Sequence, residues 1–117
     1  MGRLTTHVLD TAVGKPAENL KIALFRFENA NSVKVSEYRT NADGRTDRPM
    51  LDENDFAPGE YELQFFAGDY FDTLNISLPS PKFLDVVVIR FGISDSDSHY
   101  HVPLLLSPFG YSTYRGS

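Results

Sequence analysis

Residues 59–71 read GEYELQFFAGDYF, and this stretch indicates the fold class. From position 61 onward, apolar and polar residues alternate with the period of a strand. Glu62 and Gln64 fall on the polar face. The apolar residues that share the other face are Tyr61, Leu63 and Phe65. Alternation of this kind is typical of a strand that buries one face only, so residues 61–67 are expected to form a half-buried strand.

The residues after this strand favour the one short helix that we expect in the chain. Gly68 ends the alternation, and Asp69 is a residue type that caps helix N-termini well. We therefore predict one or two helical turns over residues 69–75, with Asp69 as the N-cap.

The remaining sequence repeats the pattern of short alternating segments. Eight glycines and seven prolines punctuate the chain about every ten residues. This spacing is typical of an all-β sandwich, and 117 residues are the size of a single domain, residues 1–117. The other expected strands span residues 4–10, 20–28, 32–40, 84–91, 99–107 and 111–115, with a short extended piece around Met50 and turns at 14–16 and 41–44.

Composition excludes several classes of function. There are 11 basic and 16 acidic residues, a net charge of −5, which argues against nucleic acid as the main partner. The absence of cysteine excludes disulfides, thiolate zinc sites and cysteine nucleophiles. No apolar run is long enough for a membrane span, and the first ten residues lack the apolar core of a secretory signal. We therefore expect a cytoplasmic protein, with periplasmic or peroxisomal placement as the alternatives.

The segment 84–91 is apolar on both faces, unlike a strand covered on one side only. Two explanations are open. Either this strand is central in its sheet, or its outer face meets another subunit.

The three histidines fall on the faces of two strands that point away from the core. In residues 99–107 the expected core face is formed by Tyr100, Val102, Leu104 and Leu106. His99 and His101 therefore point the opposite way, and His7 points away from Leu4 and Val8. If the two strands are neighbours, His7 and His101 share one surface.

Three interpretations of these histidines stay open on the residues alone. In the first, the histidines are surface side chains. In the second, His7, His99 and His101 bind a zinc ion, and in the third, histidines act as acid–base catalysts that activate water. The sequence places no carboxylate at an obvious spacing to support a metal ligand.

Arg45 directly follows the turn NADG at 41–44. It is either a surface charge paired with Asp43 or Asp47, or a fork of donors for an anion or oxyanion. The acidic loop SDSDS at 94–98 lacks the glycine and the closing glutamate of a calcium loop, so we interpret it as solvated.

Four segments together resemble the 5-hydroxyisourate hydrolase family, which is related to transthyretin. They are LTTHVLDTAVGKPA (4–17), NADGRTD (41–47), GEYELQFFAGDYF (59–71) and HYHVPLLLSPFGYSTYRGS (99–117). The terminal YRGS is the marker that separates this hydrolase from transthyretin itself. The resemblance implies that the catalytic residues are His7, Arg45 and His101.

The resemblance also implies an architecture and a reaction. The architecture is a transthyretin-like (prealbumin-type) β-sandwich of two four-stranded sheets with one short helix, assembled as a homotetramer, a dimer of dimers with sites at the dimer–dimer interface. The reaction is hydrolysis of 5-hydroxyisourate to 2-oxo-4-hydroxy-4-carboxy-5-ureidoimidazoline in urate degradation. It implies neither a metal nor a cofactor.

The expected roles follow from the chemistry of each residue. One of His7 and His101 takes a proton from the attacking water and the other orients it, in an order that the sequence leaves open. Arg45 stabilises the oxyanion. The terminal residues Tyr114, Arg115, Gly116 and Ser117 are expected to bind substrate by closing the pocket wall, with Tyr114 and Arg115 alternatively serving the subunit interface. His99 is expected at the rim or on the surface.

Two other classes of function compete with this hydrolase. A transthyretin-type carrier would bind a small ligand in the same channel without catalysis, but two histidines and an arginine make that channel polar and cationic. A zinc-dependent hydrolase would lose its activity to a chelator.

Overall fold

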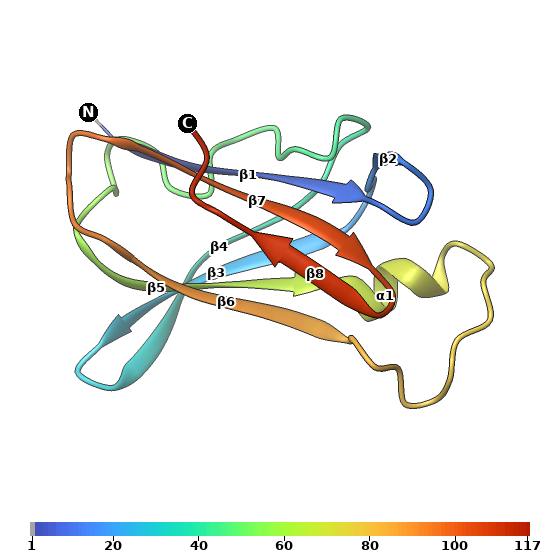
Figure 1. Ribbon diagram of the computed structural model, residues 1–117. Helices are drawn as coiled ribbons and strands as arrows, with labels where there is room; N and C mark the ends of the chain where they lie inside the picture. Colours follow the sequence, from blue (N-terminus) through green and yellow to red (C-terminus); the bar gives the residue numbers. More distant parts are fainter. Residues whose placement is uncertain (1) are drawn as a thin grey trace.

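The computed structural model describes residues 2–117, and within that range it has eight strands and one helix (Figure 1). The strands form two four-stranded sheets, which confirms the predicted β-sandwich. The elements are β1 (Arg3–Asp10), β2 (Lys15–Pro16), β3 (Lys21–Glu28), β4 (Asn31–Arg39), β5 (Gly59–Phe66), α1 (Ala67–Asp72), β6 (Val86–Ile93), β7 (His99–Ser107) and β8 (Gly110–Thr113).

The first sheet has the strand order β2-β1-β7-β8 and the second has the order β4-β3-β5-β6. In Figure 1 the first sheet lies above the second, and α1 lies at one end of the sandwich. The pair β1·β7 is parallel, whereas the other strand pairs are antiparallel. The parallel pair brings the two histidine-bearing segments, far apart in sequence, side by side.

The core lies between the sheets and follows the predicted alternation. Tyr61, Leu63 and Phe65 of β5 are fully buried, as expected. The even-numbered residues of β7 face them from the first sheet, and Leu104 and Leu106 are also fully buried. A buried Leu or Phe side chain contributes about 1.5–3 kcal/mol by leaving water, so this interlayer contact is the main source of stability.

The helix begins two residues earlier than predicted, and Asp69 is not its cap. Helix α1 follows β5 directly, Phe66 occupies the N-cap position, and no side chain caps the first turn. The reason is a tertiary contact. The amide of Gly68 donates to the carbonyl of Asp85 across 2.8 Å, which ties the first turn to the segment that leads into β6.

Two smaller expectations were also wrong. Residues 15–16, expected in a turn, pair with the end of β1 as the strand β2. The last strand was predicted over residues 111–115, but β8 ends at Thr113. The chain then leaves the sheet edge, and Gly116 returns to the backbone of His101.

The segment that is apolar on both faces is not central, because β6 lies at the edge of its sheet. Val87 and Ile89 face the core, whereas Val86 and Val88 are 40% and 44% exposed on the outer face. The alternative, that this outer face meets another subunit, stays a prediction.

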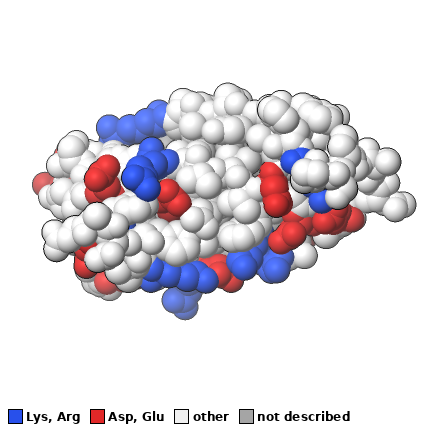
Figure 2. All heavy atoms as spheres, turned by 90° about the horizontal axis from the view of Figure 1, so that it is seen from below, with Lys and Arg blue, Asp and Glu red and all other residues white. Residues whose placement is uncertain are grey.

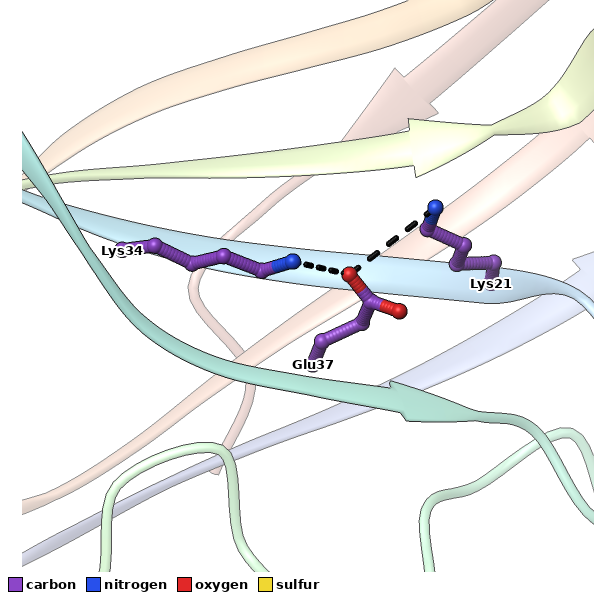
Figure 3. A network of polar contacts seen from close by, with 3 residues as sticks. All are labelled: Lys21, Lys34 and Glu37. Atoms are coloured by element: carbon purple, nitrogen blue, oxygen red, sulfur yellow. Dashed lines mark hydrogen bonds and ion pairs between the residues drawn. The ribbon is translucent and has the colours of Figure 1, made fainter.

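The opposite edge of the same sheet carries charges instead. Figure 3 shows Glu37 of β4 between Lys34 and Lys21, and the Lys21 Nζ to Glu37 Oε1 distance is 3.8 Å. Exposed ion pairs of this kind contribute little to stability, but charges on an edge strand discourage pairing with another chain.

The face shown in Figure 2 mixes basic and acidic side chains. In the second sheet, Arg90 of β6 and Glu62 of β5 form an ion pair at 3.5 Å. This distribution agrees with the net negative charge of the sequence and offers no field of one sign to a nucleic acid on this face. Within residues 2–117, no helix is long and apolar enough to cross a membrane.

Candidate active site

The register of β1 and β7 places the two predicted histidines on one face. Thr5 is paired with His101, and His7 is paired with Pro103, so these side chains point to the same side of the sheet. That side is opposite to the core, and His7 and His101 are both half-buried. The prediction that both point away from the core and share one surface is confirmed.

The turn 41–44 brings Arg45 to the same face. An isolated antiparallel bridge joins His7 to Arg45, and the amide of Val8 donates to the carbonyl of Gly44 across 2.8 Å. Gly44 has a φ of +75°, and a Cβ atom there would lie 2.4 Å from the carbonyl oxygen of Val8. Glycine is therefore required both by the turn and by its close approach to β1.

Asn41 fixes the shape of this turn from within. Its side-chain Oδ1 accepts hydrogen bonds from the backbone amides of Asp43 and Arg45, and its backbone amide donates to the carbonyl of Arg45 across 2.7 Å. Asn41 thus places Arg45. The residue types predict a turn here, but not this specific function of Asn41.

The C-terminal motif divides between two places. The amide of Gly116 donates to the carbonyl of His101 across 2.7 Å, and Ser117 lines the same hollow as His101. The Arg115 guanidinium instead lies 4.0 Å from the ring centroid of Tyr100, and Tyr114 is 61% exposed. Tyr114 and Arg115 line a separate hollow of about 260 Å³ beside β6.

A hollow of about 350 Å³ opens on the outer face of the first sheet. His101 and Arg45 line it together, and His7 lies beside Arg45 through the backbone bridge. The hollow is lined by Arg3, Thr5, Thr6, Arg45, Thr46, His101 and Ser117. Of these, Arg3, Thr5, Thr6 and Thr46 were not predicted. The strand period alone signals Arg3 and Thr5, since both share the face of His7.

The two imidazoles are held in their neutral form. Burial lowers the pKa of His101 below its ordinary 6.5, and the charge of Arg45 and then repulsion from a protonated His7 lower it further. Burial and then Arg45 likewise lower the pKa of His7, against opposing effects of a hydrogen bond to the Asp43 backbone and of the Asp43 charge. Both rings are therefore unprotonated at neutral pH and are able to accept a proton.

One ring nitrogen of His101 already has a partner. Its Nδ1 lies 2.8 Å from the hydroxyl of Thr5, so Nε2 is the nitrogen left for water or substrate. The arrangement therefore combines a proton acceptor and a guanidinium at one polar hollow, with a second imidazole, that of His7, beside the guanidinium-bearing residue.

The third histidine is placed elsewhere. His99 is exposed and lines a different hollow, with Arg3, Asp52 and Glu53 among its neighbours. Across residues 2–117, no three His, Asp or Glu side chains come together in a way that could hold a metal ion.

These features define a class of protein: a transthyretin-like β-sandwich with a histidine–arginine site on the outer face of one sheet. The chain belongs to the HIUase/Transthyretin family, whose model matches residues 4–116.

Relatives of known name cover the chain almost completely. It is 60% identical to 5-hydroxyisourate hydrolase 2 of Rhizobium meliloti, over 99% of this chain and 97% of that protein. It is 56% identical to 5-hydroxyisourate hydrolase of Pseudomonas aeruginosa, over 100% of this chain and 93% of that protein. These relatives support a hydrolase function.

Solved structures show the same fold. The structure of Klebsiella pneumoniae 5-hydroxyisourate hydrolase is 32% identical, with a TM-score of 0.82 and all of both chains covered. The crystal structure of (S)-allantoin synthase is 46% identical, with a TM-score of 0.93. The match covers 99% of this chain and 44% of that one, so the present chain spans less than half of that protein.

Proposed function

We propose that this chain, as one domain over residues 1–117, hydrolyses 5-hydroxyisourate to 2-oxo-4-hydroxy-4-carboxy-5-ureidoimidazoline in urate degradation. One observation carries the proposal: His101, whose pKa is lowered, lines one polar hollow with Arg45, and the half-buried His7, whose pKa is also lowered, is bridged to Arg45 through the backbone. The names of the relatives from R. meliloti and P. aeruginosa support the choice of substrate.

In the proposed reaction His101 is the general base. Its Nε2 takes a proton from water, whose oxygen attacks a ring carbonyl carbon of the substrate. The bond from that carbon to the ring nitrogen then breaks, and the imidazolium returns the proton to the leaving nitrogen. His7, beside Arg45, orients the water or the substrate.

Arg45 supplies the positive charge in this reaction. Its guanidinium forms no ion pair with a carboxylate of residues 2–117, so its donors are available to the oxygen on which negative charge develops. The same donors suit an anionic substrate.

We further propose that the terminal motif binds substrate. Two observations on the single chain support this: Gly116 contacts His101, and Ser117 lines the hollow. Tyr114 and Arg115 line the hollow beside β6, so in this proposal they act through the subunit interface.

The proposed assembly is a homotetramer, a dimer of dimers with its sites at the dimer–dimer interface. The outer face of β6 exposes Val86 and Val88, and β8 exposes Tyr111 at 46%. Apolar groups at two sheet edges suit burial by further copies of the chain. Sedimentation velocity on the untagged protein is expected to show a species of four chains, and a monomer at micromolar concentration would contradict this.

The proposed reaction needs no metal and no cofactor, and we propose a cytoplasmic location. The test is an ultraviolet time course in which urate oxidase generates 5-hydroxyisourate from urate before the purified protein is added. The proposal predicts rapid decay of the intermediate's absorbance, unchanged by a chelator. Decay at the spontaneous rate would contradict hydrolysis and favour a carrier, whereas chelator sensitivity would favour a zinc enzyme.

A further inference from the structure

Among the side chains of β1, that of Thr5 forms a hydrogen bond with a catalytic candidate on β7. Thr5 Oγ1 lies 2.8 Å from His101 Nδ1, across strands whose register pairs these two residues directly. Two nearby threonines, Thr6 in β1 and Thr11 just after it, bind the backbone of β7 instead. Thr6 and Thr11 donate to the backbone carbonyls of Val102 and Leu106, at 2.8 and 3.1 Å.

The contact restrains both the orientation and the tautomer of the ring. Thr5 holds the Nδ1 edge, while a Cβ atom on Gly116 would lie only 2.7 Å from Cδ2, so the terminal segment closes the other side. In histidine, the hydrogen bond made by one nitrogen decides the protonation of the other. When the Thr5 oxygen accepts from Nδ1–H, Nε2 is unprotonated and can accept a proton from water.

We propose that Thr5 is a positioning residue for the hydrolysis: its hydroxyl accepts the Nδ1–H of His101 and so presents Nε2 as the proton acceptor. This inference rests on the proposed function, because it assigns the base to His101. A base oriented by a third polar group is the arrangement that activates water and nucleophiles in unrelated hydrolases.

The experiment compares three variants of the full chain. Thr5→Val removes the hydroxyl and keeps the shape of the side chain, and Thr5→Ser restores the hydroxyl. Thr11→Val is the matched control, since it removes a hydroxyl that ties the residue after β1 to β7 outside the hollow. Turnover of 5-hydroxyisourate is measured for each variant, together with the ¹⁵N chemical shifts of the His101 ring.

We expect Thr5→Val to lower kcat about tenfold with little change in KM, because a neutral hydrogen bond is lost from the base and not from the substrate. Its ring signals should shift from the Nδ1–H form toward Nε2–H. Thr5→Ser should recover both properties, and Thr11→Val should keep both at the wild-type values. Wild-type kcat and tautomer in a folded Thr5→Val protein would overturn the proposal, as would a serine variant that fails to recover them.

The two readouts separate this inference from the proposed function. Wild-type protein that does not accelerate the decay of 5-hydroxyisourate would refute the proposed function. The nitrogen shifts report the Thr5–His101 contact without any turnover. If wild-type His101 carries its proton on Nε2, the inference fails even when the enzyme is active.

Discussion

The amide of Gly116 donates to the carbonyl of His101 across 2.7 Å, and a Cβ atom at position 116 would lie 2.7 Å from Cδ2 of the His101 ring. The terminal segment therefore packs directly on the proposed base. Only a residue without a side chain permits this approach, because real Cβ atoms do not come so close to a ring atom.

Gly116→Ala is expected to displace the His101 ring and to lower kcat for 5-hydroxyisourate at least tenfold. A movement of about 1 Å at a catalytic group costs up to 10²-fold. The free energy of unfolding should change little, since the chain near its end makes few buried contacts.

Gly110→Ala is the matched control for this prediction. Its added Cβ atom would meet nothing closer than 3.9 Å, at the hydroxyl of Ser107. If the two alanine variants have equal turnover, the terminal segment does not position His101.

Arg45→Gln should change both the rate and its pH dependence. Arg45 lowers the pKa of His7 and of His101, so its removal lets both values rise toward 6.5. A general base acts when neutral, so the rate rises with pH through the pKa of the base. The acid limb of the kcat profile is therefore expected at pH values below 6.5 in the wild type and at higher pH in the variant.

The plateau of the Arg45→Gln profile should fall about 10²–10³-fold, the usual effect of losing an oxyanion donor. Arg48→Gln serves as the control, because Arg48 lies in the same loop but does not perturb either histidine. An acid limb that stays in place in Arg45→Gln would count against the electrostatic coupling.

Tyr70→Phe tests the link between the helix and the first sheet. Tyr70 Oη donates to Asp10 Oδ2 across 2.8 Å, and Asp10 is 1% exposed. The variant leaves a buried carboxylate with one partner fewer, so the free energy of unfolding is expected to fall by about 1–3 kcal/mol. Urea unfolding at one fixed protein concentration measures it, since assembly contributes to apparent stability.

The Tyr70 phenol also predicts a pH effect. Burial and then its hydrogen bond to Asp10 raise the pKa of Tyr70 above its usual 10. The stability from this group is present below pH 10 and is lost as pH rises toward the folded-state pKa. Tyr38→Phe is the control, since within residues 2–117 its hydroxyl makes no hydrogen bond. If Tyr38→Phe lowers the free energy of unfolding as much as Tyr70→Phe does, the hydrogen bond from Tyr70 to Asp10 is not the source of the stability.

The strands and their buried faces were predictable because alternation is a local signal. Tyr61, Leu63 and Phe65 show it in β5, and the face of His101 follows from the same period in β7. The start of α1 was not predictable, because the contact of Gly68 with the carbonyl of Asp85 sets it. That contact joins two segments whose proximity depends on the tertiary fold.

The candidate site was predictable as a set of residues but not as a geometry. His7, Arg45 and His101 lie on the motifs that carried the family resemblance. The contact of Thr5 with His101 depends on the parallel register of β1 and β7, which no local pattern encodes. The approach of Gly116 to the His101 ring depends in the same way on a turn of the chain after β8.

Three histidine substitutions, compared in the 5-hydroxyisourate time course, test the assignment of the base to His101. His101→Asn removes the proposed base, and His7→Asn removes the second imidazole, which lies beside Arg45. His99→Asn is the matched control, because it makes the same change two residues away on β7, beside a different hollow. We expect a 10²–10⁴-fold loss of kcat for His101→Asn, the range typical of a general base, a clear loss for His7→Asn, and a near wild-type rate for His99→Asn. A folded His101→Asn protein that turns over as fast as His99→Asn would contradict the assignment of the site.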